Sequence, residues 1–327
     1  MVERMTENDT RERTINYLRV SVTDRCNLRC SYCMPPEGIN LKPEAEILTF
    51  EEIVEIVRAG VNWGIERVRL TGGEPLVRKN LTTLIKCLNR IKGLKEIMLT
   101  TNGVLLPGRE EKLSQAGVDR VNISLDTLKP DRFKSETGAD SWDEVWTGIK
   151  GSLQHLAPVK LNVVIRKGFN DDEIPAFVAL TEKHPLHVRF IEFMPTKADK
   201  IKQQEQYLSN KIIRERIGSE YKLQPVEIKA GSGPARYFKI PDSKGTVGFI
   251  SSISRHFCDN CNRLRLTATG KLRSCLFSSR GVELKEIVRR DVESDRLEQE
   301  FDRAVRLKSL KSKSGSSLVS HMSEIGG

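Results

Sequence analysis

The chain has 327 residues, of which 38% are hydrophobic and 30% charged, and its net charge is +10. This length predicts one large domain with a smaller second one, and the absence of a long apolar run or a signal sequence excludes a membrane protein and predicts a cytoplasmic one. The positive charge indicates an anionic partner, which could be a nucleic acid, an acidic lipid surface or a polyphosphate molecule.

The predicted elements begin after a polar, unpatterned N-terminal arm at residues 1–14, which we expect to be flexible. A helix is predicted to start after Thr49, which forms a capping box with Glu52, and another carries Trp142 and Trp146 on its core face. Six β-like runs alternate with helical patterns along the chain, at residues 17–22, 67–71, 96–100, 120–124, 159–165 and 187–193.

Alternation of strands and helices predicts parallel strands joined by right-handed crossovers. Such a pattern fits a doubly wound α/β sheet or part of a (β/α) barrel, and six units favour an open, partial (β/α)6 barrel. Barrel enzymes build their active sites where the strands end. Polar segments stand at four of these ends, at residues 71–75, 100–103, 124–126 and 192–194.

The pattern changes after Met194. A charged stretch at residues 200–217 predicts a helix, and Gly/Pro-rich residues follow at 231–234. We therefore place a barrel domain at residues 15–218 and a smaller C-terminal domain at 219–307. Residues 308–327 are rich in Lys, Ser and Gly and are predicted to be a flexible linker and tail.

Seven cysteines occur in the chain. In a reducing compartment they are more often ligands or catalysts than disulfide partners. Cys87 lies on the apolar face of a predicted helix and is expected to be an ordinary, partly buried thiol. The other six form two groups of three, which are Cys26, Cys30 and Cys33, and then Cys258, Cys261 and Cys275.

The first cysteine group lies in one short loop just after the first predicted strand. A disulfide would leave one cysteine over, and a structural zinc site needs a fourth ligand that is absent nearby. Three thiolates can instead hold a cubane iron–sulfur cluster with one iron open to a small molecule. The spacing C-x3-C-x2-C resembles the signature of the radical S-adenosylmethionine (SAM) superfamily.

The resemblance to the superfamily implies that the open iron binds SAM and passes it one electron. The sulfonium bond then breaks and a 5′-deoxyadenosyl radical forms, while the protein orients the radical and excludes other reactants. The turn Gly72–Pro75 resembles the superfamily's methionine-binding turn, in which bare backbone can approach the ligand. It is not a P-loop, because no Gly-Lys-Ser/Thr follows.

The second cysteine group admits two interpretations. His256 is near enough in sequence to complete a Cys3His zinc site with Cys258, Cys261 and Cys275. Arg263 and Arg265 follow directly, and arginine is suited to binding an anionic substrate. A second cluster that binds substrate is therefore the favoured interpretation.

Further segments narrow the resemblance to the GTP 3′,8-cyclase family, lyases that act first in molybdenum cofactor biosynthesis. These segments are residues 18–25, 69–75, 99–103, 122–126, 189–194, 261–265 and 326–327. Two places depart from the family pattern. Thr269-Gly270 stands where Asp-Gly is expected, and residues 195–199 lack the usual Gly-rich, Trp-containing segment.

Membership of this family would imply conversion of GTP to (8S)-3′,8-cyclo-7,8-dihydroguanosine 5′-triphosphate. The adenosyl radical abstracts the C3′ hydrogen of the ribose, and the carbon radical attacks C8 of guanine. One electron and a proton then complete the product. Holding the base and the triphosphate at opposite ends would fix the ribose between them.

The resemblance also implies a role for individual residues. SAM would be bound by Tyr32, Gly73, Ser124 and Met194. GTP would be bound by Arg19, Arg69, Thr100, Lys160, Arg263, Leu264 and Arg265, with Arg67 and Arg189 as further triphosphate partners. The catalytic residues would be Arg19, Arg263 and Arg265, with Gly326 and Gly327 of a tail that inserts into the active site. The cysteine groups would hold two 4Fe-4S clusters, the second of which binds the guanine base through its open iron.

The family further implies reduced flavodoxin or ferredoxin as electron donor, cyclic pyranopterin monophosphate synthase as downstream enzyme, and a homodimer. Two alternatives stand beside this interpretation. One is a radical enzyme that modifies RNA or a peptide, and the other is a zinc-containing nucleic-acid-binding module without catalysis. The chain shows no recognised nucleic-acid-binding motif, so no nucleic acid partner is expected.

Overall fold

Twelve strands form one continuous sheet in the computed structural model, which describes residues 14–34, 38–194, 200–228, 233–255, 257–290 and 294–309. The first six strands are β1 (Tyr17–Ser21), β2 (Arg67–Thr71), β3 (Glu96–Thr101), β4 (Arg120–Ser124), β5 (Val159–Ile165) and β6 (Leu186–Glu192). They are parallel and lie in chain order across the middle of the sheet. This arrangement confirms the predicted partial barrel.

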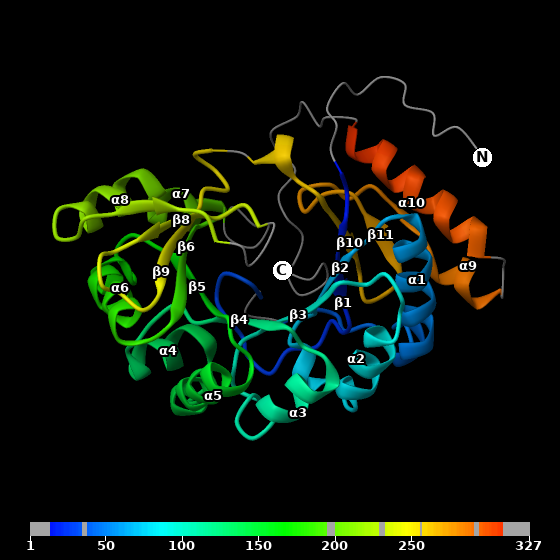
Figure 1. Cartoon of the computed structure of the whole chain (residues 1–327), viewed down its shortest axis with the longest axis horizontal. Helices are drawn as coiled ribbons and strands as arrows, with labels where there is room; N and C mark the ends of the chain where they lie inside the picture. Colours follow the sequence, from blue (N-terminus) through cyan, green and yellow to red (C-terminus); the bar gives the residue numbers. More distant parts are fainter. Residues whose placement is uncertain are drawn as a thin grey trace.

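Helices α1 to α6 cover the outer, convex side of the curved sheet (Figure 1). Their bounds are α1 (Phe50–Trp63), α2 (Leu81–Asn89), α3 (Glu110–Ala116), α4 (Pro130–Thr137), α5 (Trp142–His155) and α6 (Ile174–Lys183). Hydrophobic and polar residues alternate along much of the central strands, as in Arg67–Thr71, because one face packs on these helices and the other lines the interior. The core therefore lies between the sheet and the helices.

The predicted capping box is present at the start of α1. The Thr49 hydroxyl accepts a hydrogen bond from the backbone of Glu52, and the Glu52 carboxylate accepts one from the backbone of Thr49 at 2.7 Å. The α1 helix packs against α10 (Ser294–Ser309), where the rings of Trp63 and Phe301 stack with centroids 5.7 Å apart. The C-terminal helix is thus anchored to the first crossover helix.

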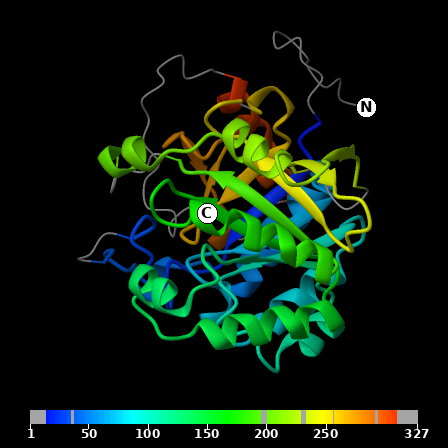
Figure 2. The same cartoon turned by 90° about the vertical axis from the view of Figure 1, so that its left-hand side faces the viewer.

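The strands after residue 219 extend the sheet at both ends. They are β7 (Gln224–Val226), β8 (Arg236–Lys239), β9 (Thr246–Ile250), β10 (Arg263–Leu266), β11 (Lys271–Arg273) and β12 (Gly281–Glu283). Strand β9 pairs in parallel with β6, and β10 pairs in parallel with β1. The first pairing can be followed in Figure 2, where the green β6 and the yellow β9 lie side by side. Residues proposed as a C-terminal domain therefore share one sheet with the barrel, and the boundary at residue 218 stays a prediction.

The stretch at residues 200–217 was expected to form one helix, but the structure divides it into α7 (Lys200–Gln206) and α8 (Asn210–Gly218). Ser209 begins a new helix, because its side chain caps the N-terminus of α8 by accepting a hydrogen bond from the backbone of Ile212. Serine favours such a cap over a helix interior. The remaining helix is the short α9 (Lys285–Arg289). No helix in the described ranges is long and apolar enough to cross a membrane.

Candidate active site

A cavity of about 350 Å³ lies inside the curved sheet and is lined by both cysteine groups. This volume is in the range of small-molecule sites. The lining includes every predicted SAM-binding residue and most of the predicted GTP-binding residues. Residues that are far apart in the sequence therefore meet in one cavity.

The first cysteine group lies in the loop that follows β1. The backbone amides of Cys33 and Met34 both donate to the carbonyl of Cys30 at 3.0 Å, which curls the end of this loop into a tight turn. Burial raises the pKa of the Cys30 thiol well above its ordinary value, and the neighbouring charge of Cys33 raises it further. Thiols crowded in this way are stabilised as thiolates when they coordinate iron, so the loop fits a cluster.

The Gly-Gly turn after β2 packs directly on the cysteine loop. The backbone amide of Gly73 donates to the carbonyl of Thr23 at 2.8 Å. A Cβ atom at Gly73 would lie 2.3 Å from the carbonyl oxygen of Arg25. Only glycine fits here, because the backbone of the turn lies too close to the backbone of the cysteine loop for a side chain. This requirement is separate from any contact of the turn with SAM.

Glu74 completes this turn as a buried carboxylate. It accepts hydrogen bonds from the Thr101 hydroxyl at 2.8 Å and from the backbone amides of Asn102 and Leu76. Burial raises the pKa of Glu74 to about 7, although these hydrogen bonds lower it. The carboxylate thus joins the ends of β2 and β3 in the wall of the cavity.

A β-hairpin brings the second cysteine group together. Cys258 and Cys261 precede β10, while Cys275 follows β11, and the two strands are antiparallel neighbours. The amide of Cys261 donates to the carbonyl of Cys258 at 3.2 Å, so these two thiols sit on one short turn. The residues between Cys261 and Cys275 form the two strands and the turn of this hairpin.

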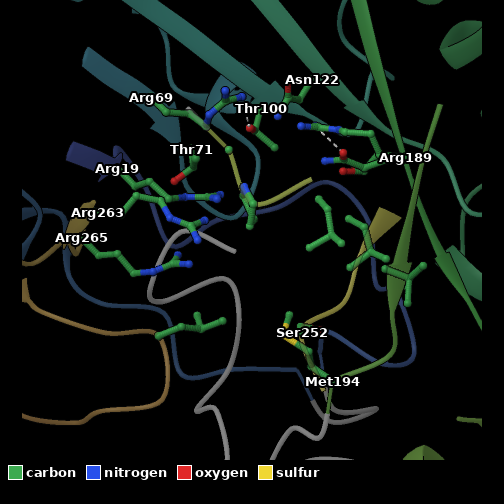
Figure 3. A pocket seen from close by; sticks show the side chains of 18 of the residues that line it. Arg19, Arg69, Thr71, Thr100, Asn122, Arg189, Met194, Ser252, Arg263 and Arg265 are labelled. Atoms are coloured by element: carbon green, nitrogen blue, oxygen red, sulfur yellow. Dashed lines mark hydrogen bonds between the residues drawn. The ribbon is translucent and has the colours of Figure 1, made fainter. Parts of the chain in front are cut away.

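Positively charged residues form a row across neighbouring strands. In the register of the sheet, Arg265 of β10 is opposite Arg19 of β1, and Arg19 is opposite Arg69 of β2. The next strands continue the row through Met98 to Arg120. Side chains at matching positions of parallel strands point to the same face, so this row faces the cavity. In Figure 3, Arg19, Arg263 and Arg265 reach into the same space from one side.

A second row lies one pleat further along the strands. It runs from Thr100 through Asn122 to Lys160 and His187. Arg69 connects the two rows by donating a hydrogen bond to the Thr100 hydroxyl at 3.2 Å, as Figure 3 shows. The cavity therefore carries two adjoining layers of hydrogen-bond donors and cations.

Burial perturbs the charges in these rows. Burial lowers the pKa of Arg265 to about 10, with a further contribution from Arg263, and burial lowers the pKa of Lys160 to about 6, with a further contribution from Arg189. The Nε and Nη1 atoms of Arg120 are buried without a hydrogen-bond partner. Such groups favour a bound anion that accepts several hydrogen bonds.

Most of the predicted site residues meet in the cavity. Its lining includes Arg19, Tyr32, Arg69, Gly73, Thr100, Ser124, Lys160, Arg189, Met194, Arg263, Arg265 and all six clustered cysteines. Leu264 is an exception, since its side chain is fully buried in the hydrophobic core. Strand alternation turns Leu264 away from the face that Arg263 and Arg265 share. Arg67 lies outside the lining and forms ion pairs with Glu66 and Glu96.

Several residues on which predictions were made lie outside the described part of the chain. They are His256, residues 195–199, and Gly326 and Gly327. Within the described ranges, no three His, Cys, Asp or Glu side chains form a group that could hold a single metal ion. The zinc interpretation of the second group depends on His256, which lies outside these ranges.

Sequence reasoning missed several residues that line or support the cavity. Arg120 and Asn122 both belong to β4 and line it, although neither was assigned a role. Lys308 was placed in the flexible linker, but it lies in α10 against Cys261. Polar residues at alternate positions of a buried strand are a signal that identifies Arg120 and Asn122 in the sequence.

Two family models match this chain. The Radical SAM superfamily model matches residues 20–181, and the Molybdenum Cofactor Synthesis C model matches residues 186–314. A solved structure of Streptococcus suis SuiB bound to S-adenosylmethionine shares the fold, with a TM-score of 0.63 and 15% identity over 93% of this chain and 69% of that one. The fold, the first cysteine loop and the superfamily match thus define a radical SAM enzyme.

Curated relatives specify the family. GTP 3′,8-cyclase of Pelotomaculum thermopropionicum is 51% identical over 86% of this chain and 87% of its own length. GTP 3′,8-cyclase of Moorella thermoacetica is 48% identical over 98% of this chain and 99% of its own length. The chain belongs to the GTP 3′,8-cyclase family, as its motifs predicted.

Proposed function

We propose that this chain converts GTP to (8S)-3′,8-cyclo-7,8-dihydroguanosine 5′-triphosphate, the first step of molybdenum cofactor biosynthesis. One observation carries the proposal: both cysteine groups and a row of buried arginines face a single cavity. A triphosphate bound by the arginines would lie between two cluster sites. No second function is needed to account for these residues.

The first cysteine group would hold the cluster that binds SAM. SAM bound there supplies the radical that removes the C3′ hydrogen. Tyr32, Gly73, Ser124 and Met194 would position SAM, since all four line the cavity together with these cysteines. The tight packing of Gly73 on the cysteine loop would keep the cluster and the SAM pocket in a fixed relation.

The second cysteine group would hold the cluster that binds the guanine base. Arg19, Arg263 and Arg265 would contact GTP next to it and stabilise negative charge during the reaction. Arg69, Thr100, Lys160 and Arg189 lie in neighbouring strands and would bind the triphosphate. With base and triphosphate held at separate points, the ribose would be fixed near SAM. Leu264 would contribute through its backbone, because its side chain is in the core.

The remaining assignments follow from the same family. Reduced flavodoxin or ferredoxin would supply electrons in the cytoplasm, and cyclic pyranopterin monophosphate synthase would use the product. The tail that ends in Gly326 and Gly327 would enter the cavity, where residues without side chains fit a narrow space. Deleting these two glycines should impair cyclisation, and unchanged cyclisation would refute the tail's role. The homodimer is testable by sedimentation of the reconstituted protein.

The proposed activity is tested by anaerobic reconstitution with iron and sulfide, followed by addition of reductant, SAM and GTP. Mass spectrometry should detect 5′-deoxyadenosine and the cyclised nucleotide together. A Cys258→Ala variant should lose GTP cyclisation. Cyclisation that survives this substitution would show that the second cysteine group is not the substrate site.

A further inference from the structure

The side-chain ammonium of Lys308 lies against the second cysteine group. Its ammonium donates hydrogen bonds to the carbonyl of Arg263 at 2.7 Å, to the carbonyl of Ser274 at 2.8 Å and to the sulfur of Cys261 at 3.4 Å. A lysine ammonium has three donors and no acceptor. All three donors of Lys308 are therefore used on the segments that carry the cysteines.

The two carbonyls lie where the β10–β11 hairpin stops pairing. Its register joins Arg265 to Arg273 and Leu266 to Leu272. Beyond these pairs, the chain leads to Cys261 on one side and to Cys275 on the other. Lys308 bridges this open end by binding one carbonyl on each side. It thus links the two arms that present the thiolates.

The C-terminal helix holds Lys308 at this position. Phe301 of α10 is fully buried and stacks on Trp63, whose ring nitrogen donates to the Asp302 carboxylate at 2.8 Å. This packing fixes α10 to α1 about two helical turns before Lys308. Lys308 is therefore supported by an element outside the hairpin that it closes.

The charge of Lys308 also acts on the sulfur itself. The Lys308 ammonium lies 3.4 Å from the Cys261 sulfur, with the hydrogen bond directed at that atom. Hydrogen bonds to the sulfur ligands of iron–sulfur clusters, and nearby positive charge, are among the factors that set their reduction potentials. A cation that donates to a ligand sulfur stabilises the more negative, reduced cluster.

We propose that Lys308 is a positioning residue for the second cluster. It holds the arms that carry Cys261 and Cys275 at the spacing the cluster needs, and its hydrogen bond to the Cys261 sulfur makes that cluster easier to reduce. This inference rests on the part of the proposed function that assigns a cluster to the second cysteine group.

The test uses Lys308→Met, which keeps a long side chain without charge, and Lys308→Arg, which keeps the charge. The control is Arg303→Met, which removes an exposed charge from the same helix. Each substitution is introduced into a chain whose first cysteine group is replaced by alanine, so that only the second cluster contributes. Iron content is measured after reconstitution, and the midpoint potential is measured by redox titration with electron paramagnetic resonance.

We expect Lys308→Met to shift the midpoint potential to more negative values or to lose iron. Lys308→Arg should recover most of either effect, and Arg303→Met should match the parent. In the metal-free protein, amides near Arg263 and Cys275 should exchange hydrogen faster in Lys308→Met. Unchanged iron content, potential and exchange in Lys308→Met would overturn the proposal. A parent that holds no cluster would instead refute the assignment of the second cysteine group.

Discussion

The Tyr32 hydroxyl donates a 2.8 Å hydrogen bond to the carboxylate of Asp126. Tyr32 belongs to the first cysteine loop, and Asp126 follows β4, so this bond ties the loop to the sheet. The Asp126 carboxylate also accepts a hydrogen bond from the backbone amide of Val164 at 2.8 Å. Burial raises the pKa of Asp126 to about 6, and the hydrogen bonds from Val164 and Tyr32 oppose that rise.

Replacing Tyr32 with phenylalanine should weaken SAM binding without loss of iron. The substitution removes the hydroxyl but keeps the ring, which packs edge-on against Phe193 with centroids 6.1 Å apart. Loss of one such hydrogen bond costs about 0.5–1.5 kcal/mol, so the SAM dissociation constant should rise roughly twofold to tenfold. Equilibrium dialysis of reconstituted protein measures this change. Tyr221→Phe, which lies outside the cavity lining, is the matched control, and equal affinities in both variants would contradict the prediction.

Replacing Gly73 with alanine should disrupt the first cysteine loop. The added methyl group would lie 2.3 Å from the backbone oxygen of Arg25, so the loop backbone must move. Overpacking of this kind typically costs about 1–3 kcal/mol. We expect iron content to fall toward that of a one-cluster protein. Gly218→Ala is the matched control, because a Cβ atom there meets nothing within 4 Å. Full iron content in Gly73→Ala would argue against the packing role.

The strands and the arginine rows differ in how far they could be predicted. The six central strands follow from short β-like runs between helical patterns, and their observed bounds agree closely with the predicted ones. The roles of Arg19 and Arg69 were predicted because they belong to family motifs. Arg120 belongs to none of the quoted motifs, and its alternation with Asn122 along the strand was the available signal. The register with Met98, and through it with Arg69, then places Arg120 in the row.

The role of Lys308 depends on contacts between distant segments. The composition of residues 308–317 is typical of a linker, and nothing in the local pattern indicates burial. The structure continues α10 through Lys308 because earlier residues of the helix pack on α1. Its three acceptors come from residues 261, 263 and 274, which only the hairpin brings together. Local sequence patterns cannot specify such an arrangement.

Replacing Arg265 with alanine should reduce GTP affinity while both clusters remain. Arg265 is buried in the row that lines the cavity, and its pKa of about 10 keeps it charged at neutral pH. Removing a charge-assisted hydrogen bond costs about 1.5–3 kcal/mol, which corresponds to a rise of roughly tenfold to a hundredfold in the dissociation constant. Equilibrium binding of GTP to reconstituted protein tests this expectation.

The control for Arg265→Ala is Arg58→Ala. Arg58 is exposed on α1 and pairs with Glu55 at 2.7 Å. Its replacement by alanine therefore removes the same formal charge at a position away from the cavity. If both variants bound GTP equally well, net charge rather than the arginine row would account for any effect. Iron content that fell only in Arg265→Ala would instead assign this residue to support of the second cluster.

GTP binding should be accompanied by proton uptake at Lys160. Burial and the charge of Arg189 together lower the pKa of Lys160 to about 6, so this side chain is largely neutral in the free protein at pH 7.5. A bound triphosphate favours the charged form and raises the pKa again. Protonation is then linked to binding, and the contribution of Lys160 to GTP affinity should decline as the pH rises above about 6.

Calorimetry at pH 7.5 in two buffers with different ionisation enthalpies measures the protons taken up. The matched variant is Lys160→Arg, whose guanidinium stays charged in both states and cannot take up a proton. Protons lost by the triphosphate itself contribute equally to both proteins, so the difference between them isolates Lys160. We expect the parent to take up close to one proton more than the variant, on the order of the full change between neutral and charged lysine. Equal uptake in the two proteins would mean that Lys160 is already charged before GTP binds or does not meet the triphosphate.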